Sequence, residues 1–247
     1  MKRNLSISVD LSKMKNRRAK HGEHYVPTDV EHIANMITHG IWIIPSLYGI
    51  KTMTENAAST KEVVTSMIYG MALFFLFTTS TLYHCFSFAG AKGMLRHFFH
   101  LGDRAVIYVF IAASYTPWLV LKDFGGVAEF FMWVVWIGCI LGIIFQFLFH
   151  ARYKSLEIVF YMVVGICPAY AVTHMTDPAG VYELAIGGVI YVSGVIFFKL
   201  DGIVPFAHAI WHVFVGLGAL AHFYAINKYL VGIHDPKESI NEIDHLI

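Results

Sequence analysis

Histidine, serine and aspartate residues occur in three short groups whose composition suits metal chemistry. The first group contains Ser80 and His84, the second contains Asp103, and the third contains His208 and His212. Residues four apart lie on one face of a helix, so the members of each pair should project together. Zinc prefers nitrogen and oxygen donors at about 2.0–2.2 Å, and three protein ligands leave a fourth position for water. We therefore predict a Zn²⁺ ion held by His84, His208 and His212.

Asp103 and Ser80 each have a catalytic and a structural interpretation. Zinc can lower the pKa of a bound water to about 7. Asp103 could orient or deprotonate that water, and Ser80 could hydrogen-bond to the site or to an oxyanion. Alternatively, Asp103 forms an ion pair with its neighbour Arg104, and Ser80 hydrogen-bonds to its own helix backbone. The sequence leaves both interpretations open.

Three further histidines are weaker candidates for the same site. His97 and His100 fit an interfacial position, although His100 stands three residues before Asp103 and could substitute as a ligand. His222 lies ten residues beyond His212, about 15 Å along a helix at 1.5 Å per residue. We therefore expect His222 not to reach the same ion.

The composition of the chain decides what kind of fold must position these residues. Of its 247 residues, 57% are hydrophobic and only 14% are charged, whereas a soluble domain is usually about 25% charged. This excludes an ordinary soluble domain. Three cysteines are too few and too apolar in context for a disulfide scaffold. The net charge of +1 gives no field that would attract nucleic acid, so we expect no nucleic-acid partner.

Apolar stretches long enough to cross a bilayer as helices, about 20 residues each, occur seven times. They are Val30–Ile50, Ser66–Phe86, Phe98–Leu121, Phe130–Phe149, Leu156–His174, Tyr182–Phe198 and Val204–Ile226. The first span is the weakest, because four polar residues occupy its first turns: Glu31, His32, Asn35 and His39.

The polar breaks between the spans are too short to hold a further folded domain. We therefore predict an all-α fold, a polytopic membrane protein with a seven-transmembrane helix bundle over residues 28–228 that contains the zinc site. A basic N-terminal segment, residues 1–27, precedes it, and a short polar tail, residues 229–247, follows it.

The distribution of positive charge predicts the orientation of the bundle. Basic residues concentrate on the cytosolic side of membrane proteins, and seven Lys and Arg occur in the first 20 residues. A cytosolic N-terminus places the tail in the lumen or outside the cell. Ser80 and His84 then end the second span at the cytosolic side, where the spans containing Asp103, His208 and His212 begin. All three groups should therefore lie at one depth.

At these residues the chain resembles the progestin and adipoQ receptor family, which includes bacterial hemolysin III-like proteins. The motifs that carry the resemblance are Ser80-x-x-x-His84, Asp103 at the start of the third span, and His208-x-x-x-His212. The resemblance extends over about residues 27 to 228. Phrases such as Ile111–Tyr115 and Asp201–His212 look like the monocyte-to-macrophage differentiation factor branch of this family.

The resemblance implies a function as well as a fold. It implies zinc bound by the three histidines near the cytosolic leaflet. For the branch it suggests a Golgi or late endosomal and lysosomal membrane, with modulation of Ras/ERK-type signalling through protein partners. The wider family is associated with ceramidase-like hydrolysis. We therefore predict a zinc-binding signalling receptor or modulator. The alternative is a zinc-dependent lipid amide hydrolase acting on a sphingolipid, with Asp103 and Ser80 as its catalytic residues.

Overall fold

The computed structural model describes residues 14–19, 25–90, 93–149 and 153–232. Its elements are α1 (Asp29–Gly40), α2 (Ile43–Asn56), α3 (Thr60–Phe88), α4 (Met94–Leu121), α5 (Ala128–Phe149), α6 (Lys154–Ile166), η2 (Cys167–His174), α7 (Val181–Lys199) and α8 (Ala207–Tyr229). They form seven segments long and apolar enough to cross a membrane, counted over these ranges. The predicted all-α, seven-span fold is confirmed. The basic residues before position 14 and the tail beyond 232 lie outside the described residues.

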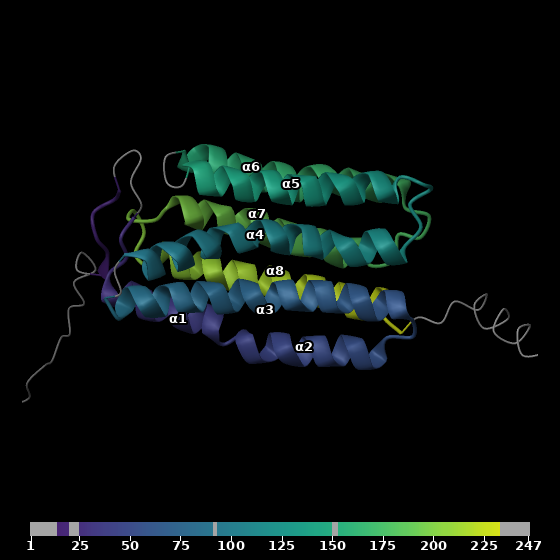
Figure 1. The fold of residues 1–247 in the computed structure, drawn as a ribbon, viewed down its shortest axis with the longest axis horizontal. Helices are drawn as coiled ribbons and strands as arrows, with labels where there is room; N and C mark the ends of the chain where they lie inside the picture. Colours follow the sequence, from purple (N-terminus) through teal and green to yellow (C-terminus); the bar gives the residue numbers. More distant parts are fainter. Residues whose placement is uncertain (1–13, 20–24, 91–92, 150–152, 233–247) are drawn as a thin grey trace, which may run out of the picture.

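The helices run side by side along one axis, and the first and last described residues lie at opposite ends of the bundle (Figure 1). Helix α3 packs against α1, α2 and α4, and α8 packs against α1 and α7. Helices α5 and α6 pack on the far side of α4 from α3. The C-terminal end of α3 and the N-terminal ends of α4 and α8 therefore meet at one end of the bundle. Which side of a membrane this end faces stays a prediction.

The first span differs from the single helix predicted over Val30–Ile50. It is broken into α1 and α2 at Ile41 and Trp42. Pro45 explains the position of the break, because proline has no N–H to donate and its ring clashes with the carbonyl four residues earlier. That carbonyl belongs to Ile41. Helix α2 therefore restarts with Pro45 in its first turn.

Two other spans also differ in their details from the prediction. In the fifth, Pro168 lies near the start of the 3-10 segment η2, which ends the regular α6. The seventh begins at Ala207 rather than Val204, because Phe206 adopts a left-handed backbone conformation with φ of 58°. Helix α8 therefore begins directly before His208, and the turn that precedes it sets the direction of this side chain.

Candidate metal centre

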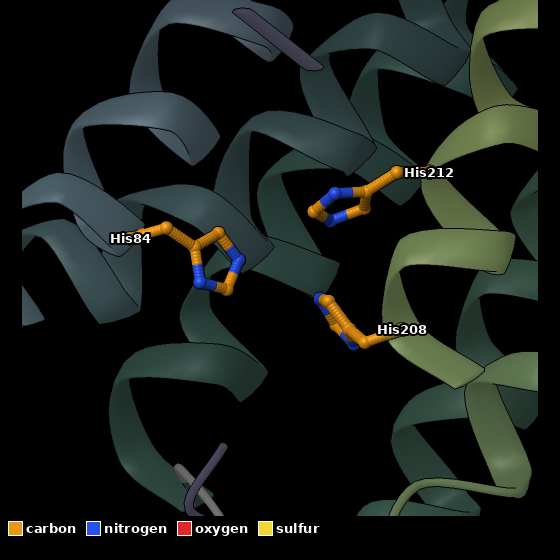
Figure 2. A group of neighbouring side chains, drawn as sticks. All are labelled: His84, His208 and His212. Atoms are coloured by element: carbon orange, nitrogen blue, oxygen red, sulfur yellow. The ribbon is translucent and has the colours of Figure 1, made fainter. Parts of the chain in front are cut away.

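The three predicted metal ligands meet at one end of the bundle. His84 lies in the last turns of α3, and His208 and His212 lie in the first turns of α8. One nitrogen of each ring lies within 4.8 Å of the others, and Figure 2 shows the rings turned toward a common space. Tetrahedral zinc bound at about 2.0–2.1 Å would hold such nitrogens roughly 3.4 Å apart. Small side-chain rotations would therefore close the group around one ion.

The Nδ1 atom of each ring contacts a residue outside the cluster. His84 Nδ1 lies 3.0 Å from His32 Nδ1, His212 Nδ1 lies 3.2 Å from Thr38 Oγ1, and His208 Nδ1 lies 3.3 Å from Asp201 Oδ2. Metal-binding histidines usually have their second ring nitrogen held in this way. The Nε2 atoms remain for ligation, and that of His84 is buried with no hydrogen-bond partner in the described chain. The donor set therefore fits zinc.

Burial makes these imidazoles unusual for an apolar bundle. His84 and His212 are only 1% and 2% exposed. A buried polar atom without a partner costs free energy, so an open ligand position at Nε2 of His84 is best explained by a group that fills it. A metal ion would do so.

Helix α1 supplies a face of polar residues that the sequence reasoning did not connect with the site. His32, Asn35 and His39 are buried and recur at helical spacing, which places them on one side of α1. The ring of His39 stacks on His212 at 3.6 Å between centroids, and His32 contacts His84. Their helical spacing in the sequence was the signal that could have connected them with the site. The first span is therefore less apolar than the others because its polar face packs against the histidine cluster.

Asp103 and Ser80 lie at the edge of the cluster. Asp103 lines the same cavity as the three histidines and interacts electrostatically with His208. Ser80 lies near Asp103, but its buried Oγ makes no hydrogen bond of normal geometry, either to its helix backbone or to another described residue. Arg104 donates to Glu157 on α6 at 2.6 Å, and it also interacts electrostatically with Asp103, so the ion-pair interpretation of Asp103 stays open. The placement of Asp103 and Ser80 is compatible with the catalytic interpretation.

The three weaker histidine candidates from the sequence, His97, His100 and His222, are not part of this group. His100 stacks on Tyr83 with 4.7 Å between ring centroids and is not part of the group of three nitrogens. His97 lines a smaller hollow beside Arg96. His222 lies on α8 beyond His212, as expected from its position in the sequence.

Comparison with known proteins shows where this fold belongs. Residues 30–223 match the family model described as haemolysin-III related. The chain belongs to this family. It is 47% identical over 218 residues to the monocyte to macrophage differentiation factor of Homo sapiens, an alignment that covers 87% of this chain and 91% of that protein. It is also 34% identical over 212 residues to the hemolysin-3 homolog of Bacillus subtilis (strain 168), covering 82% of this chain and 96% of that protein.

The resemblance read from the sequence motifs is therefore confirmed at the level of the haemolysin-III related family. The matched range contains all five predicted site residues: Ser80, His84, Asp103, His208 and His212. The family is a multi-pass membrane family, in agreement with the seven apolar spans.

Just before the range matched by the haemolysin-III model, Tyr25 ties the N-terminal segment to the site. Its hydroxyl donates to Glu31 Oε2 at 2.7 Å, and Glu31 Oε1 accepts from the backbone N–H of Phe206 at 3.3 Å. Burial and the hydrogen bond to Glu31 raise the pKa of the Tyr25 phenol above its usual range. Glu31 on α1 therefore links the N-terminal segment at Tyr25 to the turn at Phe206, next to the start of α8.

In this haemolysin-III related protein the histidine cluster opens into a cavity of about 690 Å³. That volume falls within the range of about 300–1,000 Å³ typical of small-molecule sites. The walls are mainly apolar side chains of α4, α6, η2, α7 and α8. Helix α7 packs chiefly on α8, whereas α6 packs on α4 and α5, and η2 packs on α5. The cavity therefore lies between these two groups of helices.

Proposed function

We propose that this protein binds zinc through His84, His208 and His212 and hydrolyses an amide bond in a lipid. The observation that carries the proposal is the opening of a buried three-histidine cluster into an apolar cavity beside Asp103. Zinc bound there would polarise an amide carbonyl and make a nearby water more acidic. An apolar chain in the cavity would place its polar end at the cluster.

The residues of the chain would each have a defined task in this reaction. Asp103 accepts a proton from the attacking water and returns it to the departing amine, as a general base and then a general acid. Ser80 donates a hydrogen bond to the carbonyl oxygen as negative charge develops on it. Asp201 and Thr38 hold the rings of His208 and His212 from outside the cluster. Each proton taken up is thus returned within one turnover.

The position of the cavity supports a lipid substrate. A ceramide-like amide has a polar linkage between long apolar chains, so it suits a site with polar groups at one end and apolar walls elsewhere. The walls formed by α6 and η2 on one side and α7 on the other would allow a chain to enter from the surrounding lipid. We therefore propose a sphingolipid as the substrate class.

The test combines zinc content with turnover by the purified full-length protein. We expect one zinc per chain, loss of zinc in His208→Ala, and retention of zinc in Asp103→Asn. Turnover of a ceramide-like amide should fall by at least about 100-fold in Asp103→Asn, the size typical of a lost acid–base catalyst. The matched control for these two substitutions is His174→Ala, because His174 is exposed and lies at the opposite end of the bundle. Equal turnover by Asp103→Asn and the unsubstituted protein would reject the hydrolase.

A second candidate function is a signalling role in which zinc stabilises the fold. It is favoured by a relative that is 47% identical and is named a monocyte to macrophage differentiation factor. We propose for this case modulation of Ras/ERK-type signalling from a Golgi or late endosomal and lysosomal membrane, through protein partners. Here Asp103→Asn should leave ERK phosphorylation unchanged in cells, whereas His208→Ala should destabilise the protein. Loss of signalling by a normally folded, normally located Asp103→Asn protein would contradict this candidate.

A further inference from the structure

The cavity beside the histidine cluster has a second group of polar side chains farther along its length. His222 on α8 and Tyr191 on α7 both line it, and their rings pack edge to face with 5.3 Å between centroids. His222 lies on the same stripe of α8 as the cavity-lining residues His208, Trp211 and Val215, at helical spacing. The cavity therefore runs along α8 from one polar group to the other.

The polar atoms of this second group are buried and unpaired among the described residues. Both ring nitrogens of His222 and the hydroxyl of Tyr191 make no hydrogen bond of normal geometry, although the main-chain carbonyl of Leu184 lies near the His222 ring. The neighbouring Tyr69 hydroxyl, by contrast, donates to the carbonyl of Ala219 at 3.1 Å. Buried polar atoms are nearly always paired, so three unpaired ones in one place call for a partner.

The two ring nitrogens and the hydroxyl define the chemistry of that partner. An imidazole offers one donor and one acceptor, and a phenol can do either. A hydroxyl or keto oxygen could bond to one ring nitrogen of His222 and to the hydroxyl of Tyr191, whereas a plain hydrocarbon chain would bond to neither. We propose that the cavity binds a lipid chain carrying an oxygen in mid-chain, with that oxygen held by His222 and Tyr191. This proposal rests on the lipid-binding role proposed above.

The separation of the two polar groups sets where the oxygen must lie. His222 stands about 15 Å beyond His212 along α8. An extended carbon chain advances about 1.2 Å per bond, as the extended backbone does. The oxygen should therefore lie roughly twelve carbons from the polar end of the ligand. A chain hydroxylated next to its carboxyl group would not reach.

Two glycines of α7 fit this arrangement. A Cβ at Gly187 would lie 2.1 Å from Cδ2 of His222, so glycine there lets the histidine ring fit between the helices. A Cβ at Gly188, which lines the cavity, would meet nothing within 4 Å. Gly188 thus offers a position at which a larger side chain can narrow the cavity without clashing with the protein.

The experiment measures equilibrium binding to the purified full-length protein and needs no turnover. The probes are octadecanoic acid, 12-hydroxyoctadecanoic acid and 2-hydroxyoctadecanoic acid, in competition with a fluorescent fatty acid. We expect the 12-hydroxy acid to bind roughly 5- to 30-fold more tightly than the other two, as one or two added hydrogen bonds imply. Tyr191→Phe and His222→Phe should remove this preference while keeping affinity for octadecanoic acid. Gly188→Val should weaken all three acids.

Each other result decides against the proposal. Equal affinity for the three acids means that the polar pair binds water only. A preference that survives Tyr191→Phe and His222→Phe places the oxygen elsewhere, and unchanged binding in Gly188→Val places the whole chain elsewhere. Binding of none of the acids rejects both this proposal and a lipid in the cavity. A preference for the 12-hydroxy acid without any amide turnover supports this proposal and rejects the hydrolase. Amide turnover without that preference supports the hydrolase and rejects this proposal.

Discussion

The Nδ1 atom of His208 lies 3.3 Å from Oδ2 of Asp201, seven residues earlier in the chain. The two residues flank the turn that contains Phe206, whose φ of 58° is rarely adopted by a residue with a side chain. Asp201 lies just before this turn and His208 just after it, on α8. The turn therefore brings a carboxylate to the outer nitrogen of a proposed zinc ligand.

This contact predicts that Asp201 positions His208 for metal binding. Asp201→Asn keeps the shape of the side chain but removes its charge. It should weaken zinc binding by about 10- to 100-fold, as substitution of residues that hold metal ligands usually does. Competition with a fluorescent chelator measures this. Asp177→Asn, at the other end of the bundle, should leave the zinc affinity unchanged. Unaltered affinity in Asp201→Asn would show that the contact has no role in holding the metal.

The ion pair between Arg104 and Glu157 predicts a large effect on stability. The two side chains are 11% and 3% exposed and lie 2.6 Å apart, and Tyr161 donates to Glu157 at 3.1 Å. Glu157→Gln removes the carboxylate that lies against the buried Arg104 guanidinium, so it should destabilise the protein by about 3–5 kcal/mol. Thermal unfolding in detergent is the measurement.

The matched control for this ion pair replaces both partners with apolar residues. Arg104→Met combined with Glu157→Leu removes the buried charges together, so it should be closer in stability to the unsubstituted protein than Glu157→Gln is. A double variant that is less stable than Glu157→Gln would show that the pair contributes net stability.

Close packing between α4 and α5 predicts opposite outcomes at two glycines. A Cβ at Gly142 would lie 2.3 Å from the ring of Tyr108, whereas a Cβ at Gly188 meets nothing within 4 Å. Gly142→Ala should therefore destabilise the protein by about 1–3 kcal/mol through overpacking, and Gly188→Ala should not. Comparison of the two melting temperatures tests this. A stable Gly142→Ala would mean that α5 can move away from α4 at little cost.

The hydrogen bond from Lys122 to Asp177 predicts a pH-dependent contribution to stability. It lowers the pKa of the Asp177 carboxyl below its ordinary value. A carboxyl whose pKa is lower in the folded state stabilises above its unfolded pKa of about 3.9 and loses this effect as the pH falls through the folded value. The stability difference between Asp177→Asn and the unsubstituted protein should thus be small near pH 7, because the Asp177 carboxylate is exposed. It should vanish in strong acid.

Salt provides an independent check on this surface pair. Added salt near neutral pH should reduce the difference between the two proteins, because exposed charges are screened. A difference that persists at high salt and in strong acid would show that the substitution Asp177→Asn changes the loop in some other way than by removing the charge.

The seven spans, the common face of His208 and His212 and the family could all be predicted from the sequence, because each depends on residues that lie close together in the chain. Hydropathy over about 20 residues defines a span. Four-residue spacing places His208 and His212 on one face of a helix whatever surrounds it. The break at Ile41 could also have been foreseen from Pro45, since the clash of a proline with the preceding turn is local.

Other features of the site were decided only by the tertiary structure. Whether His84 meets His212, and whether His39 stacks on it, depends on which helices become neighbours, and those helices are far apart in the sequence. The packing of α1 between α3 and α8 made the polar residues of the weakest span part of the site. The packing of α7 on α8, and of α6 on α4 and α5, left a cavity in front of Tyr191 and His222. Residue types and spacing thus determine what each helix can present, but packing determines which faces meet.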